Sequence, residues 1–232
     1  MSASPASEVV REGPRVVIAC EVMRPELESA HASAPDVEVE YLEQGLHRTP
    51  ELLEEALRSA IDVASRRAGQ IVLGYGLCSN GTANLVARRQ ELVIPRVHDC
   101  ISLFLGSRED YDEAFNARSG TYYITPGWVA AGKDPIGVLE DDYIPRVGRE
   151  TALWALEEEL KHYTHVTLIN TGIGDVDALR SRARSNADFL NKTYEEVPGS
   201  LAFFEKILRG PYDEGDFVRV APGDAATQDA FL

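Results

Sequence analysis

The spacing of apolar residues along the chain predicts strands that alternate with helices. Short apolar runs, or apolar and polar positions in alternation, predict strands over residues 15–20, 37–42, 70–74, 92–97, 121–125, 166–170 and 217–220. Apolar positions three and four residues apart predict helices over residues 24–32, 49–64, 101–105, 111–117, 150–163, 175–192 and 201–208. The helix over 49–64 is the clearest, because Thr49 and Pro50 supply start signals.

This alternation predicts an α/β fold of three layers, with a mostly parallel sheet and helices on both of its faces. A further helix is expected to start near Thr82, and residues 132–149, which are punctuated by Gly, Pro and Asp, are expected to form a long loop or insertion. Residues 1–13 are small and polar without a period, so they predict a disordered tail. The remainder, 14–232, is predicted to be a single α/β domain.

Composition and charge restrict the classes of partner that the protein is expected to bind. The 232 residues are 44% hydrophobic, which allows a sizeable core without disulfides. The net charge of -15, from 38 acidic against 23 basic residues, argues against nucleic acid and against an anionic membrane surface. No apolar run approaches the roughly 18 to 20 residues needed to cross a bilayer, and the first residues lack a signal-peptide pattern. We therefore expect a cytoplasmic protein that acts on a small molecule.

All three cysteines stand at or just after the end of a predicted strand. Cys20 ends the first strand, Cys78 follows the third and Cys100 follows the fourth. Because ligands bind at the carboxyl ends of parallel strands, three residues far apart in sequence can meet there. In a reducing compartment, a sparse and odd set of cysteines favours a metal-binding, catalytic or buried role over disulfides.

The residues around two of these cysteines strengthen the prediction of a metal site. Cys78 lies in the run Gly-Tyr-Gly-Leu-Cys-Ser-Asn-Gly over 74–81, where glycines allow a tight turn. His98 and Cys100 are two apart, so an extended backbone would point both to one side. Zinc binds Cys sulfur and His nitrogen readily. The predicted ligand set is Cys20, Cys78, His98 and Cys100, or any three of them.

Other candidates surround this set. The residues expected to line a cofactor or substrate site are Gly76, Ser79, Asn80, Gly81, Tyr123 and Trp128. The backbone amides of 79–81 are candidates to bind an anion or to stabilise a thiolate. Glu21 and Asp99 are candidate acid, base or ligand-orienting groups. The other four histidines lack ligand spacing and are expected to be surface or packing residues: His31, His47, His162 and His165.

At these residues the chain resembles the bacterial and archaeal family labelled DUF1638, over roughly residues 15–223. The segments that carry the resemblance are 19–21, 74–81, 96–100, 123–128, 198–200 and 222–223. The resemblance implies an association with corrinoid-dependent methyltransferase systems, without a settled reaction. The pair His98 and Cys100 with a distant cysteine is also similar to the zinc pattern of methylcobalamin:thiol methyltransferases, in which zinc activates a substrate thiolate.

Three functional hypotheses follow. The first is a zinc enzyme of one-carbon or sulfur metabolism that transfers a thiol or methyl group, with one ligand position open for a thiol or methylated compound. The second is a [4Fe-4S] enzyme, desulfidase-like or lyase-like, whose three cysteines leave one iron open. The third is a non-catalytic accessory protein that handles a corrinoid or a metal. The chain lacks the Asp-x-His-x-x-Gly pattern of base-off corrinoid proteins.

Overall fold

Two sheets organise the chain in the computed structural model, which describes residues 13–231. The larger sheet has five strands in the order β2-β1-β3-β4-β8. Its members are β1 (Arg15–Cys20), β2 (Val37–Leu42), β3 (Gln70–Gly74), β4 (Leu92–Pro95) and β8 (Phe217–Val220). The first four are parallel, and β8 runs antiparallel to β4 at the edge. Of the predicted tail, all but Gly13 lies outside the described residues.

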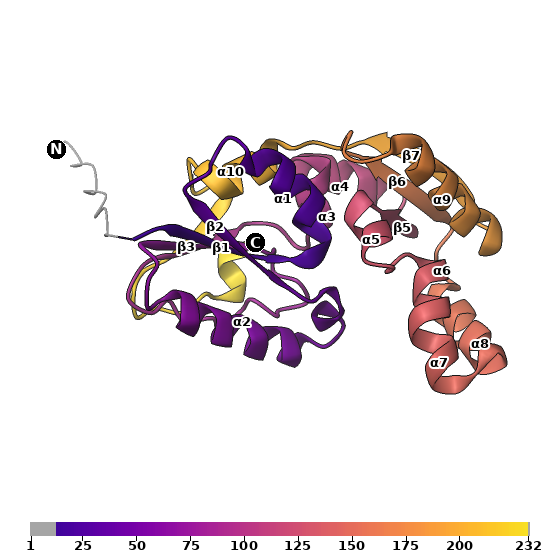
Figure 1. Cartoon of the computed structure of the whole chain (residues 1–232), viewed down its shortest axis with the longest axis horizontal. Helices are drawn as coiled ribbons and strands as arrows, with labels where there is room; N and C mark the ends of the chain where they lie inside the picture. The colour runs from indigo at the N-terminus through magenta and orange to yellow at the C-terminus, as the bar shows by residue number, and fades with distance from the viewer. Residues whose placement is uncertain (1–12, 232) are drawn as a thin grey trace.

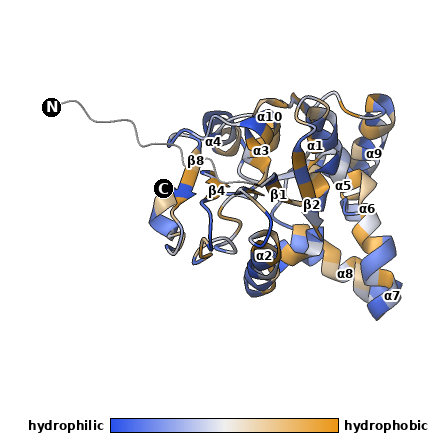
Figure 2. Cartoon of the chain, turned by 60° about the vertical axis from the view of Figure 1, so that its left-hand side comes forward, coloured by the Kyte–Doolittle hydropathy of each residue, from blue (hydrophilic) through white to orange (hydrophobic). Residues whose placement is uncertain are grey.

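Helices cover both faces of the larger sheet (Figure 1). One face carries α1 (Arg24–His31), α3 (Ile101–Leu105) and α10 (Ala202–Arg209), and the other carries α2 (Pro50–Ala64). Short 3-10 helices follow β1, follow β2 and lie near the end of the chain: η1 (Glu21–Met23), η2 (Gln44–Arg48) and η4 (Gln228–Phe231). The hydrophobic strands lie between helices with hydrophilic outer faces (Figure 2). The predicted α/β class, with a mostly parallel sheet and helices on both faces, is confirmed.

The smaller sheet has three parallel strands, β5 (Thr121–Ile124), β6 (His165–Asn170) and β7 (Thr193–Pro198). Helix α9 (Val176–Phe189) covers one of its faces, where Val166 and Leu168 pack against Ala183. Ile169 points to the opposite side and joins the main core of the larger sheet. Alternation along β6 therefore couples the smaller sheet to the larger one.

We call residues 14–117 and 200–231 the large lobe and residues 118–199 the small lobe. The chain leaves the large lobe through α4 (Arg108–Ala117) and returns after β7. Helix α5 (Pro126–Ala130), directly after β5, packs against η1 of the large lobe. One hydrophobic cluster contains both Trp128 of the small lobe and Phe104 of the large lobe. The prediction of a single domain stays a prediction.

The segment predicted as a long loop or insertion over 132–149 is mostly helical, which corrects the expectation of a loop. It contains α6 (Pro135–Gly137), the π-helix η3 (Val138–Tyr143) and α7 (Ile144–Val147), and α8 (Arg149–Leu160) follows. These helices project away from both sheets (Figure 1). Pro135 and Pro145 lie in first turns, where a missing backbone N–H removes no helical hydrogen bond, so these prolines start helices rather than break them.

Two further differences concern local structure. The helix expected near Thr82 does not form, because Asn80 and Asn84 have positive φ angles of 71° and 66° and the segment folds as successive turns. Strand β7 was not predicted, because its central positions are the consecutive acids Glu195 and Glu196. Within residues 13–231, no helix combines the length and apolarity that crossing a membrane requires.

Candidate functional site

The carboxyl ends of β1, β3 and β4 bring the three cysteines to one place. Cys20 is the last residue of β1, and the residue before it, Ala19, is in register with Gly74 at the end of β3. Beyond the strands, the pairing continues: the Cys78 backbone N–H donates to the His98 carbonyl oxygen at 2.9 Å. Cys100 then forms the N-terminal cap position of α3. The sequence prediction that these cysteines converge therefore has a backbone basis.

The three thiols also share one electrostatic environment. Burial raises the pKa of Cys20 to about 11 and that of Cys78 to about 12, and it raises the pKa of Cys100 well above its ordinary value. The Cys20 and Cys78 sulfurs add to the shift at Cys100, since neighbouring thiolates repel one another. At neutral pH the metal-free protein therefore holds three protonated thiols.

The side chains as they stand do not form a closed cage for one ion. Among residues 13–231, no group of three or more His, Cys, Asp or Glu side chains is placed to hold a metal ion. Tetrahedral zinc with Zn–S bonds of about 2.3 Å needs its sulfurs roughly 4 Å apart. Binding a single zinc would therefore require the thiols to turn toward one another and to lose their protons.

Cys78 stands on a strained turn. Three consecutive non-glycine residues have positive φ angles: 45° at Cys78, 54° at Ser79 and 71° at Asn80. The left-handed conformation costs an L-residue roughly 1 to 2 kcal/mol. The Gly81 N–H donates to the Cys78 carbonyl oxygen at 3.0 Å, and the buried Thr82 hydroxyl donates to the Gly76 carbonyl oxygen at 2.9 Å. Such strain in non-glycine residues concentrates at functional sites.

We expect the exchange Ser79→Gly to stabilise the protein by about 0.5 to 1 kcal/mol, because glycine adopts this φ without steric cost while its greater freedom in the unfolded chain offsets part of the gain. Urea unfolding measures the change. As a control, Ser29→Gly on the exposed surface of α1 should have the opposite sign, about 0.5 kcal/mol of lost stability. A loss at Ser79 as large as that at Ser29 would contradict the left-handed turn.

Asp99 anchors the cysteine beside it. Its Oδ1 accepts the Ile101 N–H at 2.9 Å, and its Oδ2 accepts the Tyr111 hydroxyl at 3.0 Å. Burial raises the pKa of Asp99, and the carboxylate in turn adds to the raised pKa of Tyr123, so this tyrosine of the small lobe faces the same place. His98 is exposed and interacts electrostatically with Asp99. The structure groups the three thiols and leaves His98 at the surface beside them.

The remaining predicted site residues differ in their surroundings and in their relation to the thiols. Glu21 follows Cys20, raises its pKa by charge repulsion and pairs with Arg24 at 3.7 Å on the surface. Trp128 is buried and meets the Phe104 ring edge-on, with centroids 5.8 Å apart. Gly76 is needed because a methyl group there would come within 2.6 Å of the Val97 carbonyl oxygen. Gly81 is similarly restricted by the side chain of Leu53, so both glycines shape the turn rather than offer polar atoms.

The ends of the small sheet complete the junction between the lobes. After β6, the Thr171 hydroxyl donates to Oε1 of Glu26 on α1 at 2.8 Å. Glu26 is fully buried, and among the described residues its Oε2 has no hydrogen-bond partner. After β7, the Ser200 N–H donates to the Phe104 carbonyl oxygen at 2.9 Å. The residues that follow β6 and β7 thus contact α1 and α3 of the large lobe.

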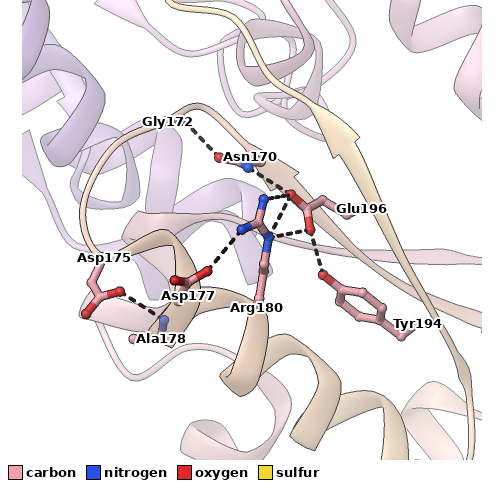
Figure 3. Close-up of polar contacts among 8 residues, drawn as sticks. All are labelled: Asn170, Gly172, Asp175, Asp177, Ala178, Arg180, Tyr194 and Glu196. Carbon is pink, nitrogen blue, oxygen red and sulfur yellow. Dashed lines mark hydrogen bonds and ion pairs between the residues drawn. The ribbon is translucent and has the colours of Figure 1, made fainter.

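A hollow of about 590 Å³ opens at the ends of β6 and β7, lined by Asn170, Thr171, Gly172, Glu196, Val197, Pro198 and Gly199. Its charged groups are already paired (Figure 3). Arg180 Nε donates to Glu196 Oε2 at 2.8 Å, and Asn170 and Tyr194 also donate to that carboxylate, which holds its pKa at about 2. The Asn170 side chain also accepts the Gly172 N–H at 3.0 Å, an ordinary turn contact. This hollow therefore has the volume to hold a small molecule, but the charged group that lines it is already paired within the protein.

Sequence reasoning missed three residues of the junction. Tyr75 is 2% exposed, and burial raises the pKa of its hydroxyl well above the ordinary value, with a further contribution from each of the three cysteines. Its position between two glycines of the cysteine motif was an available signal. The sequence contains no comparable signal for Tyr111 or Glu26, because each lies on a helix and contacts a group that belongs to another element.

The fold and this junction define a two-lobed α/β protein with three cysteines near the carboxyl ends of its parallel strands, of which Cys20 is buried and the other two are half-buried. The chain belongs to the family DUF1638, described as a protein of unknown function, whose family model matches residues 41–208. The predicted family is confirmed, and the match includes Cys78 and Cys100 while Cys20 precedes it. Neither the curated proteins nor the solved structures contain a significant match to the chain.

Proposed function

We propose that this chain is a metal-dependent enzyme that binds its metal through Cys20, Cys78 and Cys100 at the junction of the two lobes, with zinc as the first candidate. The observation that carries the proposal is the convergence of the three cysteines near the carboxyl ends of β1, β3 and β4, with Cys78 held on a strained turn. Three protein ligands leave one coordination position for a substrate, as catalytic zinc sites do. The exposed His98 is then a neighbour rather than a ligand.

The reaction class that fits three thiolate ligands is transfer of a methyl group to a thiol. Zinc held by Cys20, Cys78 and Cys100 would supply a position where a substrate thiol could be activated at neutral pH. The substrate sulfur attacks the methyl carbon, a sulfur–carbon bond forms, and the bond to the methyl donor breaks with its electron pair leaving on the donor. Tyr123 and Trp128 bring the small lobe to this position, and Asp99 orients Cys100 through the start of α3. A corrinoid-dependent system as donor rests on the family resemblance alone.

A [4Fe-4S] cluster is the second candidate, because cysteine thiolates are the usual ligands of such clusters. The cysteines are coupled electrostatically, yet the described side chains are not placed for a single ion. A cluster of four irons spans more space than one zinc and can take three cysteine ligands with one iron left for substrate.

Metal analysis of protein purified without oxygen tests both candidates. We expect about one zinc, or about four irons with a broad absorption band near roughly 400 nm, per chain. The changes Cys20→Ser, Cys78→Ser and Cys100→Ser should each remove most of the metal. The matched control His98→Gln should keep it, because that side chain is exposed.

Retention of full metal content by every cysteine variant would refute the shared site, as would a wild-type protein that binds neither metal after reconstitution. Loss of metal in His98→Gln would instead restore the four-ligand set of the sequence analysis. Methyl transfer from methylcobalamin to 2-mercaptoethanol, followed by absorption, separates an enzyme from a protein that binds metal without turnover.

A further inference from the structure

The helical arm formed by α6, η3, α7 and α8 carries the most exposed large apolar side chain of residues 13–231. This is Trp154 on α8, which is 64% exposed and has no hydrogen-bond or ring partner in the described part of the chain. The arm projects away from both sheets (Figure 1). A single exposed apolar residue is common on protein surfaces, so the significance of Trp154 depends on its neighbours.

An apolar groove of about 420 Å³ lies beside Trp154, between α8 and the end of α9. Its apolar lining comes from Leu153, Leu156 and Leu160 on α8 and from Phe189 and Leu190 at the end of α9. Phe189 is itself 44% exposed. Trp154 is three residues before Glu157 and seven before Lys161, which also line the groove, so its side chain stands on the same side of the helix. The groove and the indole therefore form one surface, which we call the arm groove.

The charged residues beside the arm groove change sign along α8. Glu150 in the first turn and Glu157 are acidic, and neither has an ion pair within residues 13–231. Lys161 caps the other end of the helix, and Lys192 also lines the groove. A second copy related by a two-fold axis runs its α8 in the opposite direction, so its basic end faces this acidic start. A symmetric dimer requires a surface that complements itself in this way, whereas a basic partner protein would be repelled by the two lysines.

We propose that the arm groove is the contact between two copies of this chain, with their α8 helices antiparallel across a two-fold axis. Glu150 then faces the partner's Lys161, and the Trp154 indole enters the groove of the other copy beside the partner's Glu157. Both pairs have the same midpoint along α8, so one alignment satisfies both. The indole N–H gains a carboxylate acceptor that it lacks in a single copy. The contact lies wholly in the small lobe, so the inference is independent of the proposed metal site.

Sedimentation equilibrium of the full chain over a range of protein concentrations tests the contact. The wild type should approach twice its chain mass of 25.5 kDa. Trp154→Glu places a charge where the indole is buried in the dimer, and it should raise the dissociation constant about 100-fold. Because the exposed indole has no polar or ring partner within one copy, this variant should fold as the wild type does, which circular dichroism checks. The matched control Leu52→Glu, at a side chain of α2 that is 52% exposed, should leave the dimer intact.

An exchange of charges tests the antiparallel alignment. Glu150→Lys places like charges opposite each other in the dimer and should weaken association about 10-fold. The addition of Lys161→Glu to the same chain reverses both members of the pair, and the two-fold axis repeats the exchange on the other side. The double variant should therefore recover most of the wild-type affinity.

A wild-type chain that remains a monomer up to about 100 µM overturns the proposal, because a specific interface should associate more tightly than that. A dimer whose dissociation constant is the same in Trp154→Glu as in the wild type places the contact elsewhere on the molecule and also overturns it. Failure of the double charge exchange to recover what Glu150→Lys removes overturns the antiparallel pairing of the two helices.

Discussion

The variant Gly127→Ala is expected to lose about 3 kcal/mol or more of its free energy of unfolding, because a methyl group at this position would overlap the carbonyl oxygen of Val22. Gly127 lies in α5 of the small lobe, and Val22 lies in η1, two residues after Cys20. The added methyl carbon and the Val22 carbonyl oxygen are both fixed by the backbone, so neither can move away as the end of a flexible side chain would. The overlap forces α5 away from the large lobe.

Urea unfolding measures the effect, and metal binding reports its consequence at the thiols. The control Gly45→Ala lies in η2, where a methyl group would meet only the Glu43 side chain at 3.6 Å, and it should change stability by less than about 1 kcal/mol. Equal unfolding free energies for Gly127→Ala and the wild type would show that the lobes do not meet as described.

The variant Glu26→Gln should be more stable than the wild type at alkaline pH and lose that advantage in acid. Burial raises the pKa of Glu26 from 4.5 to about 7, while the Thr171 hydroxyl partly opposes this shift. Between these two values the folded state holds a proton that the unfolded state has released, so wild-type stability falls as the pH rises through this window. A glutamine stays neutral throughout. The difference between the two proteins should therefore grow by roughly 3 kcal/mol from pH 4.5 to pH 8.

Urea unfolding of both proteins at a series of pH values measures this difference, and other titrating groups cancel in the comparison. The second variant Thr171→Val removes the hydroxyl that stabilises the carboxylate, which raises the folded-state pKa of Glu26 further, so its loss of stability should continue to a higher pH than in the wild type. Parallel pH profiles for wild type and Glu26→Gln would contradict a buried, proton-holding Glu26 at the junction.

Part of the candidate site could be predicted from the sequence because its positions follow from strand ends. Cys20, Cys78 and Cys100 each terminate an apolar run, and parallel strands place such termini along one edge. The alternation expected of His98 and Cys100 did not persist, because the chain turns after β4 and Cys100 starts a helix. The prediction depended on an extended backbone after β4, and there the Asp99 carboxylate instead accepts the N–H of Ile101, the first residue of α3.

The sequence by itself determined the class of the fold and the family, since apolar periodicity is a local property and the motif residues are contiguous. Only the tertiary structure decided that a second sheet forms a small lobe, that the segment after Gly132 is helical, and that Tyr75 lies among the thiols. The contact between Thr171 and Glu26 joins residues 145 positions apart. Such contacts depend on the packing of whole elements against each other, and a local pattern of apolar and polar residues carries no record of them.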